Sequence, residues 1–324
     1  MYKIVRREVF TPTTFLWDVE ARDVSKVAQP GHFVMLRLRE GSERIPLTVA
    51  DYDRDRGTIT LVVQALGKTT RDMMANFQEG DSFLDFVGPL GQAQHVEKVG
   101  HVVVVGGGLG VAPVYPQLRA FKHAGNRTTS IIGFRSQDLV FWEDRFKKHS
   151  DTLLVCTDDG SYGRKGFVTD ALKEVLEKEK PDLVVAIGPL PMMHACVETS
   201  RPFGVKTMVS LNAIMVDGTG MCGSCRVTVA GQVKLMRWVD SSSRLTSVNQ
   251  RWSSRPASKR SGAKRRVSSA SAAGFSDCVP AARSGSGSQH EARNSTTPPS
   301  DSGRSSVSMS PACSLCAAVS AAVR

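Results

Sequence analysis

The sequence predicts an antiparallel β-barrel followed by an α/β domain built on a parallel sheet. Up to about Gln64 short runs alternate polar and apolar residues, whereas from about residue 97 the runs are wholly apolar and are followed by helical stretches. Alternation is typical of antiparallel strands with one solvated face, and continuous apolar runs are typical of parallel strands buried on both faces. A chain of 324 residues, 41% of them hydrophobic, has room for two or three domains with real cores.

The predicted barrel rests on three short alternating runs, at residues 14–21, 32–39 and 57–64, which Pro-Gly, Asp and Gly residues separate. Short strands at this spacing favour a small antiparallel barrel.

The predicted parallel sheet rests on four apolar runs, at residues 101–106, 128–134, 152–157 and 182–188. Two of the intervening helices are plain in the sequence, around Phe167–Lys178 and Pro191–Ser200. Strands that alternate with helices in this way indicate βαβ units. A third segment, 206–234, holds a loop rich in Gly and Cys and a strand-like run that starts at Cys225.

The last 90 residues differ in composition from the rest. They carry 13 basic and 4 acidic residues, so +9 of the net charge of +11 lies there, and they hold 24 Ser but only three aromatic residues. Such a segment has too few large apolar groups to offset the entropy of ordering. We therefore expect residues 235–324 to form a disordered basic tail, and domains at 1–96, 97–205 and 206–234.

Charged residues near the N-terminus interrupt any secretory signal, and no window is apolar enough to span a membrane. Seven Cys in 324 residues are too few for a disulfide scaffold. We expect a soluble, cytoplasmic protein in a reducing compartment.

The strongest nucleotide signal is an apolar strand that runs into a glycine-rich turn and then a helix. The glycines would let backbone N–H groups approach a pyrophosphate at the helix N-terminus. A lone turn of this kind is as often purely structural. A second glycine follows the strand at 182–187, at a spacing that could line the same crevice. The residues are Gly106, Gly107, Gly108, Gly110 and Pro113, with Gly188, Pro189 and Met192 in the second segment.

Two segments of the predicted barrel combine cationic, hydroxyl and glycine residues. They are Arg44, Pro46, Leu47 and Thr48, and Gly67, Lys68, Thr69 and Thr70. An Arg with Thr hydroxyls and helix-end amides can hold a diphosphate through charge-assisted hydrogen bonds. Each segment alone is more often a solvated charge or a helix cap, but their joint occurrence before a dinucleotide-like domain favours binding.

Cys222 and Cys225 lie two residues apart in a glycine-rich loop that begins at Asp217. By spacing alone they fit part of an iron–sulfur site, a zinc half-site, a redox dithiol or two unligated thiols.

These motifs together resemble the ferredoxin reductase-like flavoproteins. Arg44–Thr48 is similar to their flavin motif, Gly67–Thr70 to their flavin-diphosphate loop, Gly108–Pro113 to their nicotinamide-nucleotide turn, and Gly88–Gly91 to the turn between their domains. The resemblance implies FAD, NAD(P) and no catalytic acid–base residue in the protein.

The cysteine loop narrows the resemblance to the small subunits of NADH-dependent ferredoxin:NADP oxidoreductase, also called sulfide dehydrogenase. They are close to the electron-transfer subunits of dihydroorotate dehydrogenase, which carry Cys where this chain has Asp217. The resemblance implies a [2Fe-2S] cluster held by Asp217, Cys222 and Cys225. The segment 157–166 resembles the same subfamily.

The resemblance covers residues 1 to about 234 and then stops. Arg237 stands where the subfamily has its last cluster cysteine, and a guanidinium cannot ligate iron. One expected ligand is therefore missing, which would impair the electron relay. We hypothesise a shift of reading frame near Lys234; a genuine basic tail is the alternative.

By resemblance, the expected function is electron transfer from NAD(P)H through FAD to the cluster. The cluster would pass the electrons to a larger subunit of a heterodimer, which carries its own flavin and iron–sulfur groups. That partner would reduce ferredoxin or another acceptor. One alternative is a dihydroorotate dehydrogenase subunit in pyrimidine synthesis. Another is a non-catalytic protein whose tail binds nucleic acid, although we expect no specific nucleic-acid or membrane partner. Arg135 and Ser136 could meet a 2′-phosphate, but the resemblance points to NAD.

Overall fold

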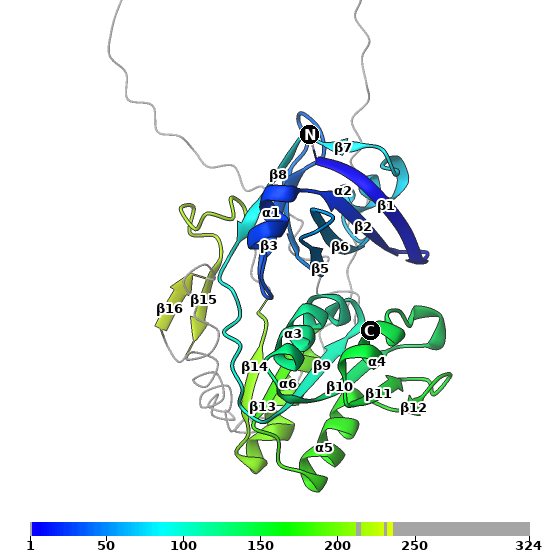
Figure 1. The fold of residues 1–324 in the computed structure, drawn as a ribbon, viewed down its shortest axis with the longest axis vertical. Coiled ribbons are helices and arrows are strands. Elements are labelled where there is room, and N and C mark those ends of the chain that lie inside the picture. Colours follow the sequence, from blue (N-terminus) through cyan, green and yellow to red (C-terminus); the bar gives the residue numbers. More distant parts are fainter. Residues whose placement is uncertain (1, 212–214, 230–231, 236–324) are drawn as a thin grey trace, which may run out of the picture. The chain divides into compact units, whose positions relative to one another are not determined.

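The computed structural model describes residues 2–211, 215–229 and 232–235 (Figure 1). The predicted tail at 235–324, including Arg237, lies outside these residues except for Leu235. The alternative in which this tail binds nucleic acid therefore concerns residues that the structure does not describe. Within the described part of the chain, none of the helices has the length and apolar character that crossing a bilayer requires.

The N-terminal region consists of two antiparallel sheets, as the sequence predicts. A five-stranded sheet has the order β5-β6-β2-β1-β7, and a three-stranded sheet has the order β4-β3-β8. Two helices, α1 and α2, complete the region. The elements are β1 (Tyr2–Thr11), β2 (Thr14–Glu20), α1 (Arg22–Val27), β3 (Phe33–Arg37), β4 (Arg44–Thr48), β5 (Asp51–Asp53), β6 (Thr58–Gln64), α2 (Lys68–Asn76), β7 (Ser82–Phe83) and β8 (Asp85–Leu90).

Aromatic side chains fill the space between the two sheets. Trp17 is fully buried, and its ring lies 4.9 Å from that of Phe15 and 5.3 Å from that of Phe83. Val34 and Leu36 of β3 contribute to the same core. Large aromatic groups bury much apolar area per residue, which suits a barrel of short strands.

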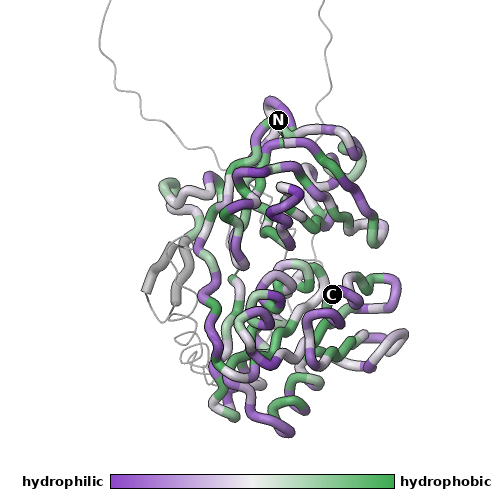
Figure 2. The backbone as a smooth tube through the Cα atoms, in the orientation of Figure 1, coloured by the Kyte–Doolittle hydropathy of each residue, from purple (hydrophilic) through white to green (hydrophobic). Residues whose placement is uncertain are grey.

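The second region is a six-stranded parallel sheet with the order β12-β11-β10-β9-β13-β14. Its central strands are wholly buried, and Figure 2 shows the hydrophobic stretches along them. The helices that the sequence predicts are α5 and α6. The elements are β9 (His101–Gly107), α3 (Val111–His123), β10 (Arg127–Phe134), α4 (Glu143–His149), β11 (Thr152–Thr157), β12 (Arg164–Lys165), α5 (Val168–Lys178), β13 (Leu183–Ile187), α6 (Leu190–Ser200) and β14 (Lys206–Val209), with short 3₁₀ turns η1 (Gly108–Gly110), η2 (Gln137–Leu139) and η3 (Arg201–Phe203).

The strand order reverses beside β9. From β9 the chain moves to β10 and β11, and from β12 it returns to β13 on the other side of β9. Because parallel crossovers are right-handed, α3 and α4 cover one face of the sheet, and α5 and α6 cover the other. The carboxyl ends of β9 and β13 therefore meet at a topological switch point, where open α/β sheets bind ligands.

After the parallel sheet the chain forms a loop, at residues 215–225, and an antiparallel pair, β15 (Arg226–Val229) and β16 (Gln232–Leu235). The domain boundaries that the sequence suggests stay a prediction.

An ion-pair cluster joins the barrel to the helices of the parallel sheet. The Asp51 carboxylate of β5 forms an ion pair with Arg119 of α3 at 2.6 Å and accepts a hydrogen bond from Arg145 of α4 at 3.2 Å. Burial raises the pKa of Asp51, while the two guanidinium groups act in the opposite direction. Beside this cluster the Phe10 and Phe141 rings stack with their centroids 5.0 Å apart.

We expect Asp51→Ala to lower the free energy of unfolding by about 3 kcal/mol, because it leaves two partly buried guanidinium groups without their carboxylate. Chemical denaturation measures this loss. The matched control is Asp23→Ala: Asp23 is fully exposed and lies 3.8 Å from Lys26, so its removal should leave the free energy of unfolding nearly unchanged. Equal losses in the two variants would contradict a role for Asp51 in joining the regions.

Candidate functional site

The glycine-rich turn after β9 lies at the switch point and packs closely against the start of α6. A Cβ atom built on Gly107 would overlap the sulfur of Met192, and one built on Gly110 would lie 2.7 Å from the Cα of Gly188. Because the atoms close to Gly110 belong to the backbone, only glycine fits there, whereas a side chain at position 107 would have to displace Met192. The structure thus brings the glycine-rich turn and the segment 188–192 into contact. Pro189 is the N-cap residue of α6.

The turn leads directly into a helix of 13 residues. Gly108 has a φ of +53°, which glycine adopts without strain, and Pro113 lies in the first turn of α3. The N–H of Val111 donates to the carbonyls of η1, so the N–H groups that are left for an anion at this helix end are those of the glycine-rich turn itself. The site has the chemistry that a pyrophosphate requires.

The three-stranded sheet of the barrel carries the first predicted flavin segment on its edge strand, β4. Phe33 of β3 pairs with Thr48 of β4 and with Leu90 of β8, and Met35 pairs with Pro46. Paired residues of antiparallel strands point to the same face. Because Val34 and Leu36 point into the barrel core, the alternate residues point away from it. We call this the outer face; it is formed by Arg44, Pro46 and Thr48 of β4, Phe33, Met35 and Arg37 of β3, and Asp85, Val87 and Leu90 of β8.

Leu47 has the opposite orientation. It pairs with Val34, and its partly buried side chain packs against the barrel core. Of the predicted segment, Arg44, Pro46 and Thr48 therefore present their side chains on the outer face, whereas Leu47 has only its backbone available there. The Arg44 guanidinium lies 3.2 Å from the carboxylate of Asp85, which also forms an ion pair with Arg37 at 2.8 Å.

The second predicted flavin segment forms the start of α2 and lies beside β4. The Thr70 hydroxyl accepts hydrogen bonds from the N–H groups of Leu66 and Gly67, both at 3.0 Å. The Thr69 hydroxyl donates to the carboxylate of Glu43, the residue before Arg44. Lys68 is exposed. The N-terminus of α2, which carries Lys68, thus contacts the residue that precedes Arg44. A helix N-terminus and two cations are groups that suit a diphosphate.

The loop at 215–225 folds around the carboxylate of Asp217. This carboxylate accepts hydrogen bonds from the N–H groups of Thr219 at 2.9 Å, Gly220 at 3.1 Å and Cys222 at 3.1 Å. Desolvation raises the pKa of Asp217, but the hydrogen bonds outweigh it and lower the pKa to about 2. The residue is therefore a carboxylate at neutral pH.

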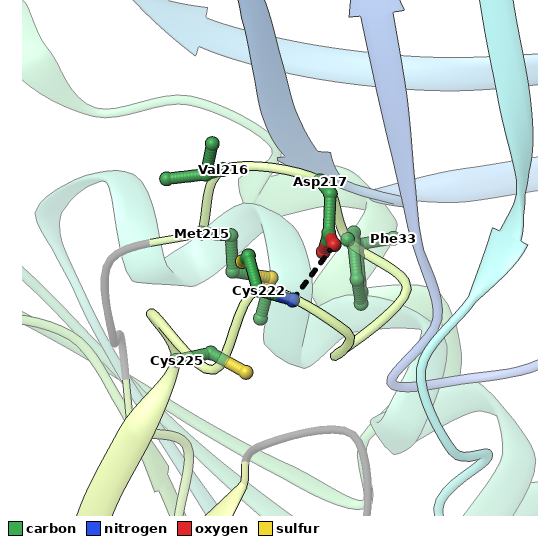
Figure 3. A pocket seen from close by; sticks show the side chains of 7 residues that line it. Phe33, Met215, Val216, Asp217, Cys222 and Cys225 are labelled. Atoms are coloured by element: carbon green, nitrogen blue, oxygen red, sulfur yellow. Dashed lines mark hydrogen bonds between the residues drawn. The ribbon is translucent and has the colours of Figure 1, made fainter. Parts of the chain in front are cut away.

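Both cysteines line one small cavity with Asp217 and Phe33 (Figure 3). Cys225 is buried, whereas Cys222 is exposed and lies 3.3 Å from the Ser224 hydroxyl, which lowers the pKa of the Cys222 thiol. A carboxylate and two thiols are donors that suit iron. In the described residues no three such side chains converge closely enough to hold a metal ion, so the ligand set stays a prediction.

Several residues of the site carry no signal in the sequence. Phe33 and Met35 belong to the alternating run at 32–39, but only the pairing with β4 and β8 puts them on the face that carries Thr48. Asp85 is likewise an ordinary acidic residue until the register sets it beside Arg44. Strand register, which the sequence alone does not reveal, determines this part of the site.

Two family models match the chain. Residues 104–198 match an oxidoreductase NAD-binding domain, and residues 212–238 match the iron–sulfur cluster binding domain of dihydroorotate dehydrogenase B. A dihydroorotate dehydrogenase B (NAD⁺) electron transfer subunit homologue from Thermotoga maritima is 49% identical over 232 residues, which cover 72% of this chain and 82% of the relative. The chain belongs to the family of dihydroorotate dehydrogenase B electron-transfer subunits and their homologues.

Further comparisons agree with this family. The corresponding subunit from Fusobacterium nucleatum is 36% identical and covers 65% of this chain and 83% of its own length. A solved structure of an NADH-dependent reduced ferredoxin-NADP oxidoreductase, described as a flavin-based electron-bifurcating system, is 45% identical, with a TM-score of 0.69 over 77% of this chain and 93% of that one. A ferredoxin NADP⁺ reductase from Neisseria gonorrhoeae shares the fold at 18% identity, with a TM-score of 0.54 over 64% of this chain and 96% of that one.

The family confirms the ferredoxin reductase-like fold, and the chain is an oxidoreductase-type electron-transfer subunit. The matches also support the predicted cofactors FAD, NAD(P) and [2Fe-2S]. Which residues contact each cofactor stays a prediction. The iron–sulfur match ends at residue 238, close to where the sequence resemblance stops.

We expect Gly110→Ala to weaken NADH binding about tenfold, or ~1.4 kcal/mol, because its Cβ would lie 2.6 Å from the carbonyl carbon of Ile187 and force the turn away from β13. Fluorescence titration with NADH measures the affinity. The control is Gly204→Ala, at a residue with a φ of +62° and no atom near the added Cβ; it should cost stability only. Unchanged affinity in Gly110→Ala would show that the turn does not hold the nucleotide.

Proposed function

We propose that this subunit takes electrons from NADH, uses FAD to divide them, and delivers them singly through a [2Fe-2S] cluster to a larger partner subunit. Flavin supplies the conversion between a two-electron hydride donor and a one-electron acceptor. The protein contributes binding and orientation, and we assign no side chain to acid–base catalysis.

Each cofactor has its own set of residues in this proposal. The backbone N–H groups from Gly107 to Gly110 bind the NADH pyrophosphate, and Gly188, Pro189 and Met192 border the nicotinamide. Arg44, Thr48 and the start of α2 hold the flavin diphosphate, while Asp85 orients the Arg44 guanidinium. Asp217, Cys222 and Cys225 are the cluster ligands that this chain supplies.

The observation that carries the proposal is the common location of the predicted flavin and cluster residues. Thr48 and Pro46 lie on the outer face, and the loop with Asp217, Cys222 and Cys225 covers the neighbouring part of that face, where a Cβ built on Gly218 would lie 2.6 Å from Met35. One sheet of short strands, spaced about 4.8 Å apart, therefore carries both groups. This arrangement supports direct electron transfer between them.

We propose NADH rather than NADPH as the donor. The ends of β10 and β11 adjoin, because the N–H of Asp158 donates to Phe134 and the N–H of Asp159 donates to Arg135. Two carboxylates, Asp158 and Asp159, lie beside Arg135 at these strand ends and disfavour a 2′-phosphate. The similar oxidoreductase of known structure is also described as NADH-dependent.

The proposed partner is a larger subunit with its own redox centres, as the designation of the relatives as electron-transfer subunits suggests. A dihydroorotate-oxidising partner is the second candidate, which those designations favour. Against it, Asp217 stands where the sequence resemblance implies Cys in that group. Co-purification from cells that express each partner decides between them.

We expect the full chain to bind FAD near one equivalent and NADH to bleach the flavin absorption band. Cluster content should be low, because Arg237 replaces the fourth ligand. Arg237→Cys should raise iron and acid-labile sulfide and, after one-electron reduction with dithionite, give a [2Fe-2S] EPR signal, whereas the matched Arg237→Ser variant should not.

Protein that stays colourless after incubation with FAD would contradict the flavoprotein assignment. A full cluster in the unmodified chain would contradict the role assigned to position 237 alone.

A further inference from the structure

Met35 shows that the outer face is covered. It is 2% exposed, although it points away from the barrel core and belongs to neither hydrophobic core cluster among the described residues. The cover includes the loop at 215–225, since a Cβ built on Gly218 would lie 2.6 Å from Met35 and 3.1 Å from Leu90. Val87, on the same face, is 53% exposed, so the cover is local.

Phe33 is the residue at which the two sites meet. It pairs directly with Thr48 of the predicted flavin segment, and it lines the cavity that Asp217, Cys222 and Cys225 also line. Figure 3 shows the ring beside the Asp217 carboxylate. A Cβ built on Gly91 would lie 3.0 Å from two atoms of the ring, so the backbone of residue 91 supports it closely.

We propose that Phe33 is a positioning residue shared by the two sites, whose ring forms the wall between the flavin side of the outer face and the cysteine cavity. This inference rests on the proposed function, because it assumes that flavin occupies the face beside Thr48. The ring fixes the distance between the two sites. When FAD binds on the flavin side, the ring holds Cys225 more firmly buried.

The test measures how fast iodoacetamide alkylates Cys225 in the full chain. Peptide mass spectrometry follows the reaction, and the alkylation rate of Cys222 serves as the internal reference. In the unmodified protein, saturating FAD should slow alkylation of Cys225 relative to Cys222. Phe33→Ala should speed alkylation of Cys225 without FAD about tenfold, and FAD should no longer affect the rate.

Two further variants separate positioning from folding. Phe33→Leu keeps an apolar side chain on β3 and should retain part of the FAD effect. Tyr2→Leu removes a half-buried aromatic ring of the barrel that packs against Phe86 at 5.2 Å, away from the loop, and should leave both the rate and the FAD effect unchanged. If Tyr2→Leu behaves like Phe33→Ala, the effect is general loosening of the barrel and the proposal is wrong.

The outcomes also separate this inference from the proposed function. Failure of the unmodified chain to bind FAD would overturn the proposed function and, with it, the premise of the inference. If FAD binds but leaves Cys225 alkylation unchanged, or if Phe33→Ala retains the FAD effect, the shared wall is contradicted while the flavoprotein assignment stands.

Discussion

The pairing register of β4, β3 and β8 is the constraint on which the site depends. Because side chains alternate between the faces of a strand, the register that buries Val34, Leu36 and Phe86 in the barrel necessarily places Phe33 and Met35 on the outer face with Pro46 and Thr48. A slip of one residue would exchange the two sets. The same hydrophobic burial that stabilises the barrel therefore builds the surface on which the proposed flavin site and the cysteine loop meet.

Close backbone packing has the corresponding role in the parallel sheet. The turn after β9 lies so near the carboxyl end of β13 that a side chain at position 110 has no room. The exposed helix-end N–H groups follow from this packing together with the reversal of strand order. An ion-pair cluster at Asp51 then ties the helices that follow β9 and β10 to the barrel.

Much of the fold could be predicted from local patterns. Alternating runs indicated the antiparallel strands, apolar runs the parallel ones, and the turn glycines the junction of β9 with α3. The roles of Leu47, Phe33 and Asp51 could not, because each depends on which strands or helices lie opposite, and such long-range pairing has no local signature. Composition pointed to a separate tail after residue 234, but from residue 236 on that segment lies outside the described residues. Sequencing of the parent DNA tests the hypothesis that the reading frame shifts near Lys234.

The most direct measurement of the central claim is hydrogen–deuterium exchange of the full chain with and without FAD. If one sheet face serves both sites, FAD should slow exchange in three separate segments: residues 44–48, the start of α2 at 67–70, and the loop at 215–225. Slowing in the first two segments alone would contradict the shared face, and slowing in none of them would contradict the proposed flavin site itself.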